Sequence, residues 1–190
     1  MAILDHAAIE SMGFLSIGEN VLISDRASFY NCAQIALGNN VRIDDFCVLS
    51  AGEGGIVVGN YVHIAVYTSL IGSGLIKLSD FCNLSSRVAI YSSNDDYSGA
   101  AMSNPMVPSK YTNVFHADVN LGRHTIVGSG SVILPGVNLA DGVAVGALSL
   151  VNNDCQSFGV YAGVPAVYIR ERKRDLLAME KDLLINSKLQ

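Results

Sequence analysis

Apolar residues recur in this chain as pairs at positions i and i+2, and successive pairs are six residues apart. Eighteen such pairs run from Leu15/Ile17 to Ser149/Val151 and fall into six groups of three. Where the six-residue step lengthens, it does so after the third pair of a group. Residues at i and i+2 of an extended segment point to the same side, so each pair predicts the inward face of a short strand. Of the 36 paired positions, those that are not apolar are Thr68, Thr125, Ser131 and Ser149.

Short strands at a six-residue spacing are typical of a parallel β-helix with three flat faces per coil. We predict an all-β solenoid of about six coils, in which one corner accepts extra residues. A β-sandwich is the alternative, but it does not require the constant step that residues 119–151 keep. We also expect positive φ at tight corners for the glycines that follow the first pair of four groups, which are Gly18, Gly38, Gly59 and Gly122.

The repeat divides the chain into three parts. The N-terminal part, residues 1–14, has helical spacing over about 3–12, which predicts a cap helix on the first coil. The β-helix then covers residues 15–160. The C-terminal part, residues 161–190, contains a predicted amphipathic helix over about 171–186.

One long loop, residues 91–116, interrupts the repeat after the fourth group. It is polar and contains Pro105 and Pro108, and a loop of this length on a compact scaffold is usually functional or disordered. Its aromatic residues favour an ordered loop that packs on other residues, and these are Tyr97, Tyr111 and Phe115.

Composition narrows the class of protein. The 190 residues are enough for one domain with a continuous core. The net charge of −5 argues against a nucleic-acid partner. No apolar run is long enough to span a membrane, and Asp5 and Glu10 argue against a signal peptide. A reducing, cytoplasmic setting fits the cysteines, which show no CxxC spacing: Cys32, Cys47, Cys82 and Cys155.

The hexads, the single long loop, the segment 128–137 (GSGSVILPGV) and the segment 162–165 (AGVP) before a basic run resemble the hexapeptide-repeat acyltransferases. The most similar branches are galactoside and maltose O-acetyltransferases and N-acyltransferases of nucleotide-linked 4-amino-4,6-dideoxy sugars. The string 94–99 (NDDYSG), followed by 104–106 (NPM), looks most like the amino-sugar branch. The resemblance implies a left-handed helix, a homotrimer, acetyl-CoA as co-substrate, and active sites between neighbouring subunits.

The resemblance also implies where acetyl-CoA binds. The phosphates of CoA require positive charge, and the basic run that contains Arg170 and Lys173, together with Arg172 and Arg174, lies where they would arrive. The alternative is that these residues are ordinary solvated charges at the start of a helix. The pantetheine arm is expected along positions that match the family's CoA site: Ser129, Gly146, Ala147, Gly163 and Pro165.

The catalytic base of the galactoside-type enzymes is a histidine whose place here falls on Asp95. A carboxylate is a weak base for a hydroxyl, whereas a neutral amine needs only an acceptor for its proton, so the departure favours N-acylation. Asp95 and His63 are therefore the candidate catalytic residues. The alternatives are a turn carboxylate and a surface histidine, respectively. The candidate acceptor-binding residues are Asn83, Asp96, Tyr97 and His116.

These observations leave three alternative functions. The first is acetyl-CoA-dependent N-acetyl transfer to a nucleotide-linked amino-dideoxy sugar, for synthesis of surface polysaccharide such as O-antigen. The second is O-acetyl transfer to a galactoside-like sugar, and the third is a non-catalytic hexapeptide scaffold. A zinc enzyme of the γ-carbonic-anhydrase type is disfavoured and no metal site is expected, because His63, His116 and His124 do not reproduce its ligand spacing.

Overall fold

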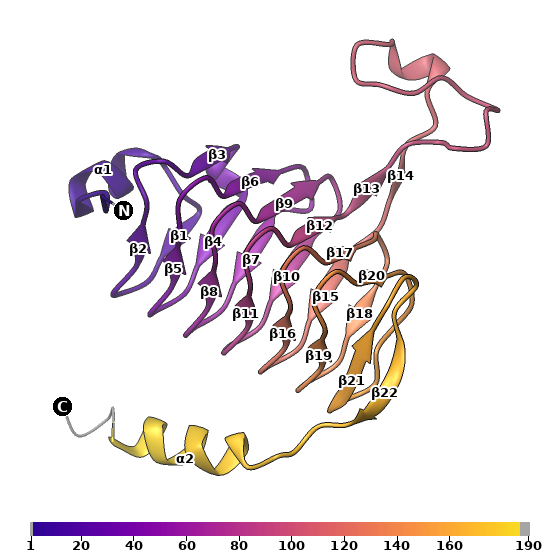
Figure 1. Ribbon diagram of the computed structural model, residues 1–190. Helices are drawn as coiled ribbons and strands as arrows, with labels where there is room; N and C mark the ends of the chain where they lie inside the picture. Colours follow the sequence, from indigo (N-terminus) through magenta and orange to yellow (C-terminus); the bar gives the residue numbers. More distant parts are fainter. Residues whose placement is uncertain (1, 187–190) are drawn as a thin grey trace.

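The computed structural model describes residues 2–186, so the outer ends of the predicted terminal parts, at 1 and 187–190, lie outside the described residues. The chain winds into a three-sided prism in which each coil contributes one short strand to each side (Figure 1). Neighbouring strands on a side come from successive coils and pair in parallel. The predicted parallel β-helix is confirmed.

Three sheets form the sides of the prism, which we call faces 1, 2 and 3. Face 1 contains β1 (Ser16–Ile17), β4 (Ile35–Leu37), β7 (Ile56–Val58), β10 (Ile76–Leu78), β15 (Val119–Leu121) and β18 (Asn138–Leu139). Face 2 contains β2 (Leu22–Ile23), β5 (Arg42–Ile43), β8 (His63–Ile64), β11 (Asn83–Leu84), β16 (Ile126–Val127), β19 (Ala144–Val145), β21 (Gly159–Ala162) and β22 (Val167–Glu171). Face 3 contains β3 (Ser28–Tyr30), β6 (Val48–Ala51), β9 (Ser69–Gly72), β12 (Ala89–Tyr91), β17 (Val132–Ile133) and β20 (Leu150–Val151). The borders between faces are edges 1/2, 2/3 and 3/1.

Face 2 continues beyond the six complete coils. Strand β21 pairs in parallel with β19 and begins an incomplete seventh coil, which extends two residues past the predicted end at 160. Strand β22 then turns back and pairs with β21 in the antiparallel direction. A helix over 171–186 was expected, but the helix α2 covers Leu176–Asn186, because the residues up to Glu171 belong to β22.

The core of the prism consists of the predicted inward pairs. From Ile35 onward every paired position is buried. In the first coil Leu15 is 63% exposed and Phe29 is only partly covered, because no preceding coil packs on them and the cap helix α1 (His6–Ser11) is short. Of the four hydroxyl side chains at paired positions, three donate hydrogen bonds to backbone carbonyls, so their polarity is satisfied: Thr68, Ser131 and Ser149.

The corner glycines have a different role from the one expected. Gly18, Gly38, Gly59 and Gly122 do not have positive φ. A Cβ atom on Gly38 would lie 2.6 Å from the carbonyl oxygen of Gly59, so glycine is required because successive coils approach closely at this corner. Positive φ falls two residues later, on Asn20, Asn40, Tyr61 and His124.

The long loop leaves the prism at edge 3/1 as a two-stranded ribbon of β13 (Ser93–Asn94) and β14 (Phe115–His116). The rest of the loop, which includes the short 3₁₀ helix η2 (Ser109–Tyr111), extends away from the body of the protomer (Figure 1). The loop was expected to pack through its aromatic side chains, but within one protomer these are exposed, with Tyr97 at 86%. A second 3₁₀ helix, η1 (Cys32–Gln34), lies at the same edge in the first coil.

Candidate active site

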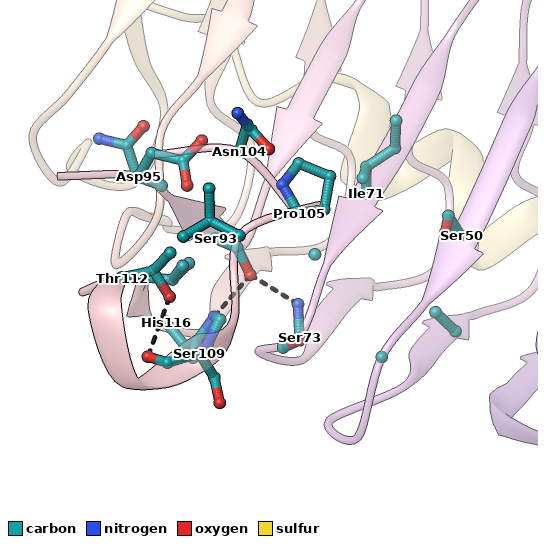
Figure 2. Close-up of a pocket in the computed structure, with 16 residues that line it drawn as sticks. Ser50, Ile71, Ser73, Ser93, Asp95, Asn104, Pro105, Ser109, Thr112 and His116 are labelled. Atoms are coloured by element: carbon teal, nitrogen blue, oxygen red, sulfur yellow. Dashed lines mark hydrogen bonds between the residues drawn. The ribbon is translucent and has the colours of Figure 1, made fainter. Parts of the chain in front are cut away.

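A cavity of about 570 Å³ lies at edge 3/1, between face 3 and the base of the long loop (Figure 2). The prism contributes the ends of β6 and β9, and the loop contributes hydroxyl, amide and apolar groups. Asp95 and His116 are the titratable residues among its lining, and no lysine or arginine lines it. The cavity therefore suits a polar organic group that carries a positive or neutral charge.

His116 is oriented by a short chain of hydrogen bonds at the floor of this cavity (Figure 2). The backbone N–H of Ser73 donates to Ser93 Oγ at 2.7 Å, and Ser93 Oγ lies 2.7 Å from His116 Nδ1. Ser93 Oγ accepts from the Ser73 N–H and keeps one lone pair and one hydrogen for His116 Nδ1, so the tautomer of the ring decides which of the two donates. Ser93 thereby fixes the orientation of the His116 ring.

The two loop carboxylates differ in their surroundings. Asp95 lines the cavity, whereas Asp96 accepts a hydrogen bond from the backbone N–H of Ser98 at 2.7 Å. The hydrogen bonds from Ser98 lower the pKa of Asp96. Asp96 therefore shapes the turn, and Asp95 is the carboxylate available to a ligand. Tyr97 is exposed and does not line the cavity.

His63 lies on face 2 and is not part of the cavity within one protomer. Its Nε2 is 2.9 Å from Asp44 Oδ2, and its Nδ1 is 3.1 Å from Asn83 Oδ1. Burial tends to raise the pKa of Asp44, but hydrogen bonds from His63 and Arg42 outweigh it, and the net shift is downward. Both ring nitrogens are engaged, so this geometry favours a structural role for His63 and Asn83 rather than proton transfer.

The residues predicted to follow the pantetheine arm gather at edge 2/3 of the last coils. A Cβ on Gly146 would lie 2.9 Å from Ala162 Cβ, and the Leu148 N–H donates to the Ser129 carbonyl at 2.9 Å. The Leu150 N–H donates to the carbonyl of Gly163 at 2.9 Å, which fixes the seventh-coil segment on the sixth. Pro165 follows in the same segment and is exposed. We call this region the small-residue edge, formed by Ser129, Gly146, Ala147 and Gly163.

The four basic residues near the C-terminus divide into two groups. Arg172 donates to the carbonyls of His124 and Gly142 at 2.7 and 3.0 Å, and Arg174 pairs with Glu171 at 2.9 Å, so both hold the chain together. Arg170 is exposed on β22, where the register pairs it with Val160 of face 2. Lys173 is exposed and makes no ion pair with any residue of 2–186. Arg170 and Lys173 are the two cations available to phosphates.

The three buried cysteines do not offer a nucleophile. Burial raises the pKa of Cys47 to about 11, of Cys82 to about 12 and of Cys155 to about 11, so each is a neutral thiol at pH 7. The described residues hold no group of three potential metal ligands. None of the helices within 2–186 combines the length and apolar character that crossing a bilayer requires.

A stacked column of side chains on edge 2/3 was not anticipated from the sequence. Arg26 lies over the ring of Phe46, Phe46 stacks on Tyr67, and Arg87 lies over Tyr67. Their spacing of 20 or 21 residues is the coil repeat itself, and reading the sequence down each corner would have revealed it.

Comparisons with known proteins agree with this fold. No family model matches the chain. It is 58% identical over 180 residues to a dTDP-4-amino-4,6-dideoxy-D-glucose acyltransferase of Escherichia coli, which covers 95% of this chain and 94% of the relative. A crystal structure of an aspartate variant of AntD, an N-acyltransferase from Bacillus cereus, in complex with dTDP and coenzyme A, superposes with a TM-score of 0.94 at 43% identity and covers 98% and 100% of the two chains. A serine variant of AntD with dTDP-4-amino-4,6-dideoxyglucose and coenzyme A gives 0.93 at 43% identity over 97% and 98%.

The fold is that of the left-handed β-helix acyltransferases, an enzyme class that uses coenzyme A thioesters. Within this class, the chain belongs to the family of the dTDP-4-amino-4,6-dideoxy-D-glucose acyltransferase of E. coli.

Proposed function

We propose that this enzyme transfers the acetyl group of acetyl-CoA to the 4-amino group of a dTDP-linked 4-amino-4,6-dideoxy sugar, in the cytoplasmic synthesis of surface polysaccharide. The observation that carries the proposal is Asp95 in the wall of a polar cavity that no lysine or arginine lines. A sugar amine is attracted to such a carboxylate. The 58% identity to an acyltransferase for this class of sugar supports the same acceptor.

The AntD structures support Asp95 in a second way. Their single substitutions fall on a serine and an aspartate that are ten positions apart. In this chain Ser85 and Asp95 have that spacing, and so do Ser86 and Asp96. Because Asp96 is bound to its own turn, the pair Ser85 and Asp95 is the better match. Ser85 lies at edge 2/3, directly after β11.

The proposed reaction is a direct transfer. The neutral amine nitrogen attacks the thioester carbon, the new C–N bond forms, and the C–S bond breaks to release the thiol of CoA. Asp95 accepts the proton that the nitrogen loses, and the departing sulfur takes up a proton in turn. No cysteine acyl-enzyme is required, which agrees with the buried, neutral thiols of Cys47, Cys82 and Cys155.

The acceptor cavity and the small-residue edge are on the two opposite borders of face 3 in one protomer. We propose that the enzyme is a homotrimer in which edge 3/1 of one subunit meets edge 2/3 of the next. The exposed loop is then free to cover the neighbour, and Asp95 of one subunit faces Ser85 of another. In this arrangement the pantetheine arm follows Ser129, Gly146, Ala147, Gly163 and Pro165, and Arg170 and Lys173 bind the phosphates of CoA.

A thiol-release assay tests the reaction. We expect acetyl-CoA turnover with dTDP-4-amino-4,6-dideoxyglucose and none with simple galactosides. Turnover with hydroxyl acceptors alone would contradict N-acylation. A parallel assay with 3-hydroxybutyryl-CoA, the thioester bound in one AntD structure, decides whether acetyl is the preferred group.

A further inference from the structure

The acceptor of the proposed function carries a diphosphate, and the cavity that holds Asp95 offers it no cation. A diphosphate that lay beside the Asp95 carboxylate would be repelled. The cation that binds it must therefore lie elsewhere along the acceptor's path, and the stacked column on edge 2/3 provides one.

Edge 2/3 changes character along the prism. In the last coils it is the small-residue edge, along which the CoA arm is proposed to lie. In the second, third and fourth coils the corresponding corner positions are Phe46, Tyr67 and Arg87, and each has positive φ, between +60° and +63°. Donor and acceptor have to meet where these two stretches adjoin, and Arg87 is the residue at that junction.

The backbone hydrogen bonds show that these corner positions form one column. The Tyr67 N–H donates to the Asp45 carbonyl at 3.1 Å, and the Arg87 N–H donates to the Val66 carbonyl at 3.0 Å. In the fifth coil the Gly130 N–H donates to Ser86 in the same way, at 3.0 Å. Gly130 adds no side chain to the column, and Arg87 is exposed. The corner continues in the sixth coil with Leu148, whose side chain lies over Gly130.

The guanidinium of Arg87 is held in place without being neutralised. Its Cζ lies 5.3 Å from the centre of the Tyr67 ring. Among the residues of 2–186 it makes no ion pair. Stacking uses the face of the guanidinium and leaves its N–H groups, which lie in the plane, free for a planar fork onto phosphate oxygens.

The backbone of Arg87 has the conformation that this corner imposes. Its φ is +61°, and the residues at the same corner of other coils are alike, with Phe46 at +60°, Tyr67 at +63° and Leu148 at +57°. The positive φ therefore belongs to the corner and not to Arg87 alone.

We infer that Arg87 binds the diphosphate of the nucleotide-linked acceptor, through a fork of N–H groups presented by the ring of Tyr67. This inference rests on the proposed function and assigns the anion-binding residue of that same site. Arg26, at the far end of the same column, serves as the matched control because it stacks on Phe46 in the same manner, with Cζ 5.7 Å from the ring centre.

The test is calorimetric binding of dTDP and of CoA to the wild-type enzyme and to Arg87→Gln, Arg87→Lys and Arg26→Gln. We expect Arg87→Gln to weaken dTDP binding on the order of 10- to 100-fold, with CoA binding unchanged. Arg87→Lys keeps the charge but loses the fork, and it should fall between the wild type and Arg87→Gln. Arg26→Gln should bind dTDP like the wild type.

Three results would overturn the inference: unchanged dTDP binding by Arg87→Gln, a loss confined to CoA, or an equal loss in Arg26→Gln. If Arg87→Gln does not fold, wild-type affinity in Arg87→Lys counts against the fork, and a partial loss supports it. Failure of the proposed function would give a different result, because the wild-type enzyme would then not acylate the dTDP-linked amino sugar at all. Turnover by the wild type together with an unchanged acceptor KM in Arg87→Gln would remove only the role of Arg87.

Discussion

The two edges that border face 3 are built in opposite ways. Edge 3/1 carries an insertion, the 91–116 loop, which forms one side of the cavity lined by Asp95 and His116. In the last coils edge 2/3 has no insertion and carries small residues at Ser129, Gly146 and Ala147, beside the exposed side chain of Leu148. In the proposed arrangement, the inserted loop forms the acceptor site and the small residues of the last coils form the donor site.

This difference separates the two substrates of one reaction. If edge 3/1 binds the acceptor and edge 2/3 binds acetyl-CoA, a substitution on one edge should change the kinetic constants of one substrate and spare the other. Both edges belong to the same rigid prism, so a general loss of structure would instead change both together.

The largest effect is expected at Asp95. Asp95→Asn removes the proton acceptor but keeps the size of the side chain, and we expect kcat to fall on the order of 100-fold or more. Steady-state kinetics with both substrates measures it. Asp96→Asn is the control, because Asp96 serves its own turn, and it should keep kcat within a few-fold of wild type. Equal losses in the two variants would contradict the assignment of Asp95.

The second-largest effect is expected from a bulky side chain on the small-residue edge. Ala147→Phe should raise the KM for acetyl-CoA about 100-fold, because the ring occupies the path of the pantetheine arm. Val66→Phe places the same ring at the equivalent corner position three coils earlier and should leave that KM unchanged. A wild-type acetyl-CoA KM in Ala147→Phe would mean that the arm follows another route.

A smaller effect on the same substrate is expected at Arg170. Arg170→Ala removes an exposed cation on β22, and we expect the KM for acetyl-CoA to rise about tenfold while the acceptor KM holds. Arg174→Ala is a suitable comparison, because Arg174 already pairs with Glu171 at 2.9 Å. An unchanged acetyl-CoA KM in Arg170→Ala would exclude Arg170 from the phosphate site.

Edge 1/2 belongs to neither site, so a substitution there should change the stability of the protein and leave its activity unchanged. Glu180 of α2 pairs with Arg123 and lies 2.6 Å from His124. The hydrogen bond from His124, helped by Arg123 and partly opposed by burial, lowers the pKa of Glu180 below its ordinary value of 4.5. A lowered folded-state pKa stabilises the protein above pH 4.5, and this contribution is lost as the pH falls through the folded value.

Glu180→Gln should therefore cost about 0.5–1 kcal/mol of unfolding free energy at pH 7 and less at pH 3, since pH 3 lies below the ordinary pKa of 4.5. Denaturant titrations of both proteins at the two pH values measure the difference. A cost that is the same at both pH values would show that the charge of Glu180 contributes nothing. Turnover at pH 7 should stay at the wild-type level.

The sequence was sufficient for most of the fold, because the six-residue period is a direct consequence of one strand per face. The sequence was less reliable where the burial or backbone conformation of a residue depends on its neighbours in space. Leu15 is exposed because no coil covers it. Gly38 is required because two coils approach closely there, not because a turn needs positive φ. The helix predicted over 171–186 begins only at Leu176, because Glu171 joins a strand and Arg172 donates to the carbonyls of His124 and Gly142.

The residues of the candidate site also fall into those that the sequence could predict and those that depend on contacts in space. Asp95 and Ala147 could be named from the sequence, because the family resemblance aligns them with the family's catalytic base and its CoA groove. The two acceptors around His63, the turn that occupies Asp96 and the column below Arg87 depend on side chains 19 to 21 residues apart or on local loop geometry. Hydrophobic periodicity carries no information about those contacts.

The central claim is that each active site combines edge 3/1 of one subunit with edge 2/3 of the next. Co-expression of Asp95→Asn and Ala147→Phe, with different purification tags, tests it directly. In a cyclic trimer of mixed composition one site of three is free of both substitutions, so random mixing restores about a quarter of the wild-type activity. If instead the mixed protein shows only the average of the two variants measured alone, each protomer contains its whole site and the claim is wrong.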